Sequence, residues 1–390
     1  MPKSLMSAEP HEKSKLFGLD HLRAFAITFV VFFHYQFFGH PGWVNIIASF
    51  GWTGVDLFFV LSGFLIAGQL FATVAKGEAI PMRAFFIKRF FRIIPPYLLV
   101  LVLYFSFPLL REWGHPSPLW RYLTFTLNFG LDLKQYGTFS HAWSLCVEEQ
   151  FYLVLPLCFW WCVRFKTGNK IIWVFPALFV AGFVIRLFCW YYLMVPKLGT
   201  DAFGAAWNKF IYYPTYNRLD GLLTGVAIAG LFTFYPRVKT HVNQFSNVYM
   251  LGGLVLLVPA YFAGTPFQSF SNSIFGFPMV AIAYGIIVAA MICPANILYK
   301  AKSVVTSQLA TLSYGIYLSH KIVIHVTQAQ LTKVGVDRDS NLMMICSMAA
   351  VVTGALLMRY LVEKPALRLR DKVLLGRLAK KDVVRPIVSS

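Results

Sequence analysis

The sequence predicts an all-α, polytopic integral-membrane protein. Of its 390 residues, 58% are hydrophobic and only 13% are charged, whereas soluble domains carry about 25% charged residues. Mean hydropathy is +0.62. Apolar stretches long enough to cross a bilayer as helices, which takes about 20 residues each, recur along the whole chain. We therefore expect a single membrane domain covering residues 1–390, with about ten transmembrane helices.

The expected spans follow one another with short connections. They cover roughly residues 17–38, 51–74, 93–110, 140–163, 171–195, 211–234, 246–263, 273–292, 304–328 and 341–362. The apolar stretch 118–133 is too short to span comfortably, so we expect it to be re-entrant or interfacial.

The distribution of basic residues predicts that both termini are cytoplasmic. With this topology the inner loops and tails carry 23 of the 35 Lys and Arg residues, the outer loops 7 and the spans 5, as the positive-inside rule requires. The tails 1–15 and 368–390 are then cytoplasmic, and their charge suits anionic membrane lipids. Nucleic acid is excluded as a partner, because the charge is not gathered on a soluble domain. No small-residue cleavage site follows the first span, which indicates a retained helix.

Arg23 and His34 are the most informative residues of the first span. They are eleven residues apart, so at about 100° per residue they share one helix face, ~16 Å apart along the axis. Ionisable groups are costly inside a bilayer and usually mark a functional site. We expect this helix to form one wall of an active site.

Further ionisable residues are predicted in the outer half of the membrane. Five spans contribute them, and we expect them to face one another across one polar cavity, since unpaired charges there would be expensive. They are His34, Asp56, Glu148, Glu149, Arg218, Asp220 and His320.

A second polar group lies on the cytoplasmic side. Lys88, Arg89 and Arg92 are spaced to share a helical face before the Pro95–Pro96 pair. Clustered basic side chains bind phosphate through charge-assisted hydrogen bonds, which indicates a phosphorylated cosubstrate arriving from the cytoplasm. The six cysteines fall in or at the edge of spans without zinc spacing to histidine, so we expect packing residues and no metal site.

Several blocks together resemble the membrane acyltransferase-3 family, whose members O-acetylate surface glycans, nodulation factors and macrolides. In family order they are LDHLRAFAITFVVFFH, GWTGVDLFFVLSGFLI, IKRFFRIIPPY, HAWSLCVEEQFYLVLP, NRLDGLLTGVAIA, TLSYGIYLSH and VEKP. Two positions depart from the family pattern: Cys146 stands where a small serine-like residue is common, and His21 where glycine is common. Neither removes an expected catalytic group.

The resemblance implies transfer of an acyl group, acetyl by first expectation, from cytoplasmic acyl-CoA to a hydroxyl of a glycan or small molecule near the outer face. It implies a bacterial cytoplasmic membrane as the location and acetyl-CoA as a cosubstrate, with no bound cofactor. Some family members carry an added extracytoplasmic hydrolase-like domain, and any partner of that kind here would be a separate enzyme.

Within this reaction we expect His34 to be the general base that takes the proton of the acceptor hydroxyl. Glu148 or Glu149 would orient the imidazolium, and only one can face His34 because adjacent residues point about 100° apart. Ser144 and Tyr152 lie one turn either side of Glu148 and are expected on the same face.

The remaining candidates have two interpretations each. Arg23 would bind the phosphate of the acyl donor or hold the cytoplasmic mouth of the site. His320 would be a second acid or base, or a hydrogen-bond donor to the carbonyl. We expect Asp56, Arg218 and Asp220 to bind the acceptor or support the polar network, and the second glutamate to pair with Arg218 or Lys321. His141 and His325 are expected to be surface or packing residues, and Gly221 and Gly225 to allow close packing of helices. Arg186 has no assignment.

Two other classes of function remain compatible with the sequence. A secondary transporter or flippase would also have many spans and buried charges, although we find no inverted repeat. An acyl relay would pass the group to a partner enzyme, and a serine acyl-enzyme is a third route for the same chemistry.

Overall fold

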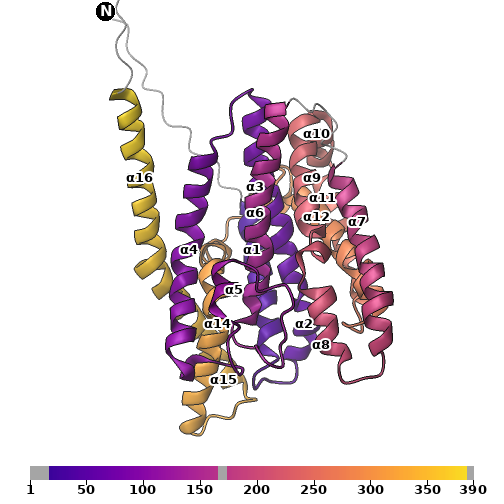
Figure 1. The fold of residues 1–390 in the computed structure, drawn as a ribbon, viewed down its shortest axis with the longest axis vertical. Helices are drawn as coiled ribbons and strands as arrows, with labels where there is room; N and C mark the ends of the chain where they lie inside the picture. The colour runs from indigo at the N-terminus through magenta and orange to yellow at the C-terminus, as the bar shows by residue number, and fades with distance from the viewer. Residues whose placement is uncertain (1–16, 166–173, 384–390) are drawn as a thin grey trace, which may run out of the picture.

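The computed structural model is a bundle of long helices that lie roughly along the longest axis of the molecule (Figure 1). It describes residues 17–165 and 174–383, and within these ranges no β-strand occurs. The predicted all-α fold is confirmed. The α-helices are α1 (Phe17–Tyr35), α2 (Val44–Gly51), α3 (Thr53–Ala75), α4 (Met82–Ser106), α5 (Leu119–Leu123), α6 (Trp143–Phe165), α7 (Val174–Cys189), α8 (Phe203–Trp207), α9 (Asp220–Phe234), α10 (Pro236–Gln244), α11 (Ser246–Ala263), α12 (Phe277–Met291), α13 (Ile297–Lys300), α14 (Val304–Lys333), α15 (Asn341–Met358) and α16 (Lys364–Val383).

A helix lies on each of the ten predicted spans. By length and composition, six helices of the described chain could cross a membrane, or seven if α9 and α10, which meet at 105°, count as one broken span. The helices α4, α6 and α14 are long but carry the charged residues of the sites described below. The chain is thus a polytopic membrane protein, and ten remains the predicted number of spans.

The segment around Pro95 and Pro96 differs from the prediction. The expected span began at residue 93, but α4 begins at Met82 and continues through both prolines to Ser106. Proline has a φ that suits a helix and lacks only the N–H, so the helix continues while the carbonyls of Phe91 and Arg92 lose their usual partners. The basic residues before the prolines therefore stand on α4 itself.

Local capping explains where several helices begin. The Ser303 hydroxyl accepts a hydrogen bond from the Thr306 N–H (3.3 Å) at the start of α14. Ser340 does the same for the Met343 N–H (3.1 Å) at the start of α15. Such caps satisfy N–H groups that have no partner within the helix.

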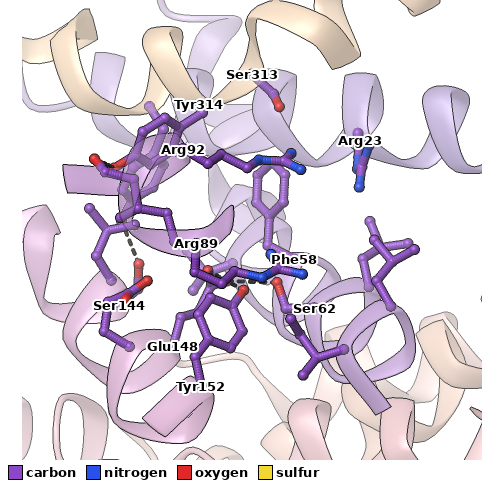
Figure 2. A pocket seen from close by; sticks show the side chains of 18 of the residues that line it. Arg23, Phe58, Ser62, Arg89, Arg92, Ser144, Glu148, Tyr152, Ser313 and Tyr314 are labelled. Atoms are coloured by element: carbon purple, nitrogen blue, oxygen red, sulfur yellow. Dashed lines mark hydrogen bonds between the residues drawn. The ribbon is translucent and has the colours of Figure 1, made fainter. Parts of the chain in front are cut away.

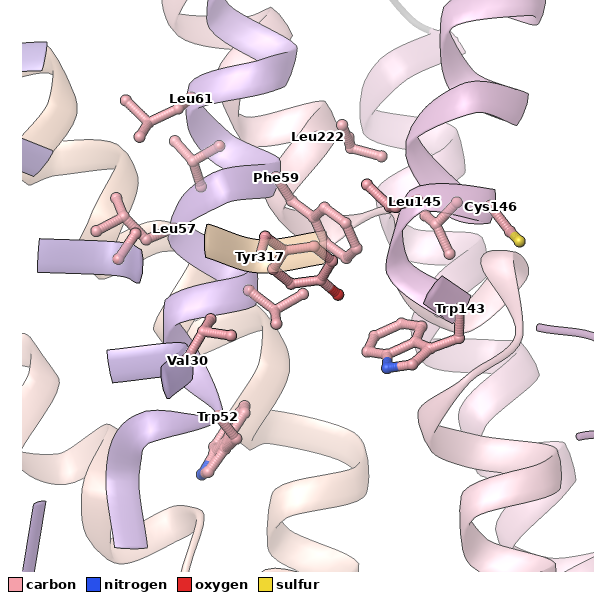
Figure 3. Close-up of a cluster of buried hydrophobic side chains, with 14 of the residues drawn as sticks. Val30, Trp52, Leu57, Phe59, Leu61, Trp143, Leu145, Cys146, Leu222 and Tyr317 are labelled. Atoms are coloured by element: carbon pink, nitrogen blue, oxygen red, sulfur yellow. The ribbon is translucent and has the colours of Figure 1, made fainter. Parts of the chain in front are cut away.

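The centre of the bundle is formed by α1, α3, α6, α9, α12 and α14. The predicted close approach of α9 is confirmed: a Cβ added at Gly225 would overlap the Val60 carbonyl of α3, and one at Gly221 would lie 2.9 Å from the Phe59 Cβ. Figure 3 shows the adjoining core, where Phe59 of α3, Trp143 of α6 and Tyr317 of α14 meet. Glycine here lets two backbones approach at a distance that any side chain would prevent.

The stretch 118–133 forms no spanning helix, as expected. It contains the five-residue helix α5 followed by turns, and it packs onto the bundle through side chains. The Tyr97 hydroxyl of α4 donates to the Tyr122 carbonyl (3.1 Å), and the Gln150 amide of α6 donates to the Phe125 carbonyl (2.7 Å).

The ends of the chain and the cysteines complete the comparison. The predicted tail 1–15 lies outside the described residues, whereas the predicted tail from residue 368 belongs to α16 as far as Val383. Figure 1 shows α16 beside α4 and apart from the rest of the bundle. Cys146, Cys189 and Cys293 are buried thiols, in keeping with packing residues, whereas Cys158 is exposed and Cys346 is half-buried.

Candidate active site

Two cavities contain most of the predicted site residues. The first, here called the arginine cavity, has a volume of about 200 Å³ and is lined by Arg23, Arg89 and Arg92 (Figure 2). The second, here called the histidine cavity, has a volume of about 680 Å³ and is lined by His34 and His141. The sequence predicted one shared cavity for the ionisable residues of the outer half of the membrane. This prediction is wrong, because Glu148 and Glu149 line the arginine cavity and His34 lines the histidine cavity.

Three guanidinium groups from two helices face the arginine cavity. Arg23 comes from α1, and Arg89 and Arg92 come from α4; Figure 2 shows them turned into the same space. In the described part of the chain, no hydrogen bond or ion pair engages any of the three. Guanidinium groups present several N–H donors in a fixed plane, so these can bind an anionic ligand without first breaking an ion pair.

Lys88 does not belong to this cavity. It was predicted on the same face as Arg89 and Arg92, but it is exposed and does not line the cavity. Consecutive helical residues point about 100° apart, and the face of α4 that is turned inward is centred on Arg89, Arg92 and Ile93.

The two glutamates of α6 also line the arginine cavity. Glu148 accepts hydrogen bonds from the Ser62 and Tyr152 hydroxyls, each at 3.1 Å, so the predicted contact one turn along α6 is confirmed for Tyr152. Neither glutamate lines the histidine cavity. The expectation that one of them faces His34 is therefore wrong, because this face of α6 is turned toward α3 and α4.

The partner of His34 is His320 of α14. Its Nε2 lies 3.0 Å from the Nδ1 of His34, and its Nδ1 lies 3.0 Å from the Ile316 carbonyl and 2.8 Å from the Tyr317 carbonyl. Carbonyls only accept hydrogen bonds, so in neutral His320 the proton is on Nδ1 and Nε2 accepts from His34. The Nε2 of His34 is then left with its lone pair, without a protein partner in the described residues.

His141 was predicted to be a surface or packing residue, and the structure rules out the surface position. Its ring lies in the wall of the histidine cavity, 5.6 Å from the His34 ring and 5.0 Å from the His320 ring between centroids. It is 2% exposed, and neither ring nitrogen has a hydrogen-bond partner in the described chain. A buried polar group without a partner is costly and needs an explanation. Its position at the start of the HAWSLCVEEQFY block, at the outer end of the predicted span 140–163, was the available signal.

The backbone before His141 is held in an unusual conformation. Phe139 has φ +53°, the left-handed region that residues other than glycine rarely adopt. Its N–H donates to the Glu112 carboxylate (3.3 Å), which also pairs with the Lys321 ammonium of α14 at 2.9 Å. The sequence suggested that Lys321 could pair with a glutamate of α6, but its partner is Glu112.

The other predicted charges form two buried ion pairs that line neither cavity, although the Arg218 guanidinium lies behind Tyr212 in the wall of the histidine cavity. Asp56 of α3 accepts from Arg218 at 2.9 Å, and Asp220 of α9 accepts from Arg186 of α7 at 2.7 Å. The Arg218 guanidinium also lies 4.1 Å from the centre of the Phe277 ring. None of these residues lines either cavity. Of the two predicted roles, support of the polar network is the one that the geometry favours.

The wall of the histidine cavity is largely aromatic. The lining includes Trp52, Trp113, Trp143 and Tyr212, and its charged members are Lys134 and Lys321, with no carboxylate among the lining residues described. Apolar and aromatic walls with a few polar groups are typical of sites that bind small organic ligands. His34, whose Nε2 has no protein partner among the described residues, is one of the residues that line this space.

Comparison with known proteins agrees with the arrangement of the motifs. The family model described as an acyltransferase domain matches residues 16–360. The peptidoglycan O-acetyltransferase OatA of Listeria monocytogenes is 28% identical over 337 residues, covering 80% of this chain and 49% of the relative. The O-acetyltransferase OatA of Staphylococcus aureus strain NCTC 8325 is 26% identical over 331 residues, covering 79% of this chain and 50% of the relative.

The chain thus spans about half the length of these curated relatives. No solved structure matches it. The match of the family model along most of the chain, together with the helical membrane fold, shows that this protein belongs to the acyltransferase-3 family.

Proposed function

We propose that the protein is an integral-membrane O-acyltransferase that moves an acyl group, acetyl in the first instance, from cytoplasmic acyl-CoA to a hydroxyl of a glycan on the opposite side of the membrane. The observation that carries this proposal is the pairing of an arginine-lined cavity with a separate cavity where a histidine presents a free nitrogen. The names of the relatives support acetyl transfer, and that of the Listeria relative makes peptidoglycan the first acceptor to test.

The arginine cavity suits the phosphates of an acyl-CoA. Arg23, Arg89 and Arg92 supply three unpaired guanidinium groups, and arginine binds phosphate by parallel, charge-assisted hydrogen bonds. The nearby Glu148 is engaged by Ser62 and Tyr152. We assign to Glu148 the role of holding the Ser62 and Tyr152 side chains in place.

The histidine cavity suits the acceptor hydroxyl. His34 accepts the hydroxyl proton on Nε2, while the hydrogen bond from its Nδ1 to His320 fixes the tautomer in which Nε2 is free. His320 takes the orienting position that a carboxylate holds in a Ser-His-Asp triad. The hydroxyl oxygen can then attack the thioester carbonyl of the acyl donor.

The base is tested with the full chain in lipid nanodiscs. The acyl donor is radiolabelled acetyl-CoA, the acceptor is muramidase-solubilised peptidoglycan, and the product is base-labile acetate on the glycan. His34→Ala should lower transfer about 10²–10⁴-fold, the usual contribution of a general base. His241→Ala, on the surface helix α10, is the matched control. Full transfer by His34→Ala would refute this role.

The phosphate site is tested by charge reversal on α4. Arg92→Glu should weaken binding of coenzyme A at least about 10-fold, because a charge-assisted hydrogen bond contributes about 1.5–3 kcal/mol. Lys88→Glu changes the net charge equally, but Lys88 lies outside the cavity. The affinity of this variant for coenzyme A should therefore stay near that of the wild type. Calorimetry measures the affinity of both variants for coenzyme A, and equal losses of affinity would indicate a general effect of charge.

A further inference from the structure

Among the residues that the structure describes, the two cavities share only two lining residues, Val55 of α3 and Tyr317 of α14. Tyr317 is buried, and its hydroxyl makes two short hydrogen bonds of 2.6 Å, one with the Ser144 hydroxyl and one with the His141 carbonyl. Figure 3 shows its hydroxyl directed toward α6. Ser144 lines the arginine cavity and His141 the histidine cavity, so this hydroxyl stands at the junction between them.

The donor of each hydrogen bond at the junction can be assigned. The His141 carbonyl only accepts, so the Tyr317 hydroxyl donates its proton there. Ser144 must therefore donate to the oxygen of Tyr317. Tyr317 thus has one O–H that a carbonyl oxygen at the junction could receive instead, while Ser144 continues to orient its oxygen.

The proposed reaction places the thioester at this junction. The guanidinium groups line only the arginine cavity, and His34 lines only the histidine cavity. An acyl donor held by the arginines can meet an acceptor held at His34 only where the cavities adjoin, beside Val55 and Tyr317.

We propose that Tyr317 is a catalytic residue whose hydroxyl donates a hydrogen bond to the thioester carbonyl oxygen and stabilises the negative charge that develops there. This inference rests on the proposed acyl transfer. Donors aimed at such an oxygen from a water-poor site commonly supply a large part of the rate.

The steps balance without another reactant. The acceptor oxygen forms a bond to the carbonyl carbon, the hydroxyl proton goes to the Nε2 of His34, and the carbonyl electron pair moves to the oxygen that Tyr317 contacts. When that pair returns, the carbon–sulfur bond breaks and the thiolate of coenzyme A leaves. The thiolate takes the proton from His34, which restores the free base.

A structural role for Tyr317 is the competing explanation, since its hydrogen bonds join α14 to α6. The two roles differ in what they change. Loss of an oxyanion donor lowers kcat and leaves binding of the acyl donor intact, whereas a loosened junction lowers thermal stability and disturbs binding.

The test is Tyr317→Phe in the full chain in nanodiscs, with acetyl-CoA and muramidase-solubilised peptidoglycan as probes. We expect kcat to fall about 10²–10³-fold, with the affinity for coenzyme A and the unfolding midpoint near those of the wild type. Ser144→Ala should have a smaller effect in the same direction, because Ser144 acts through Tyr317.

The matched control is Tyr284→Phe. Its hydroxyl is buried and pairs with the Thr53 hydroxyl at 2.8 Å, but it lines neither cavity, so kcat should be unchanged. A wild-type kcat for Tyr317→Phe, or a loss of coenzyme A affinity as large as the loss of rate, overturns the inference and leaves the proposed function standing. A wild-type protein that binds no coenzyme A and transfers no acetyl overturns both.

Discussion

Arg186 lies in α7 with no exposed surface, and its sequence context suggested no role. Its guanidinium donates to both oxygens of Asp220, at 2.7 and 3.2 Å, and to the Asn217 carbonyl at 3.0 Å. Sequence placed Arg186 and Asp220 on different spans and could not pair them, since the rotation of each helix is set by packing. Their pairing explains how two charges are tolerated away from both cavities.

We expect Asp220→Ala to destabilise the protein by about 3–5 kcal/mol, because it leaves the Arg186 charge buried without a partner. The double variant Asp220→Leu with Arg186→Met should be more stable than the single variant, since it removes both charges. The midpoint of unfolding in detergent, followed by tryptophan fluorescence, measures this. Asp201→Ala, on an exposed loop, is the control. A double variant less stable than Asp220→Ala would contradict this account.

Arg23 and His34 show how far the sequence could predict the site at the level of residues. Their spacing on one face of α1 led us to expect one wall of an active site, and the structure places them in the walls of two different cavities. Eleven residues of helix cover ~16 Å, which is enough to reach from one cavity to the other. The spacing predicted that both side chains lie on one face of α1, but it could not show that Tyr317 stands between the two cavities beside that face.

At the scale of elements, α9 and α3 pack closely in the core, with Gly225 of α9 against the backbone of α3. Gly225→Ala should destabilise the protein by about 1–3 kcal/mol, the usual cost of overpacking, because the new Cβ would meet the Val60 carbonyl. The same unfolding assay measures it.

Gly230 provides a matched control for this prediction on the same helix. A Cβ there would lie 3.5 Å from the Phe71 ring, an ordinary contact. Gly230→Ala should therefore be neutral or stabilising, since alanine favours a helix over glycine by about 1 kcal/mol. Equal destabilisation by both substitutions would show that helix packing is not the cause.

The element boundaries reveal what sequence patterns can and cannot show. Hydrophobic stretches located a helix on every predicted span, because burial in lipid demands long apolar segments. The start of α4 was misplaced, since basic residues and prolines normally mark a loop, whereas here the helix continues through them to bring Arg89 and Arg92 to the cavity.

At the scale of the whole molecule, the histidine cluster is assembled from α1, α14 and the turn before α6. His34, His141 and His320 are far apart in sequence, and only the packed bundle brings their rings within 5.6 Å of one another. Depth counted along each span placed His34 and His320 in the same half of the membrane, but it did not point to His141. It could not separate the histidines from Glu148 and Glu149, because depth says nothing about the direction in which a side chain points.

The proposed path of the acyl group also depends on the orientation of the molecule in the membrane. Figure 1 shows α10 near one end of the bundle and α2 near the other. The charge bias of the loops predicts that the end with α10 is cytoplasmic. This is also the end from which an acyl-CoA would enter under the proposal.

Single cysteines test this orientation in a background with the native cysteines replaced. Gly42→Cys, before α2, and Lys239→Cys, on α10, are both at exposed positions. We expect a membrane-impermeant maleimide to label Gly42→Cys in right-side-out vesicles and Lys239→Cys in inside-out vesicles. The reverse pattern would place both termini outside, and acyl-CoA could then not enter from the cytoplasm at the end of the bundle that carries α10.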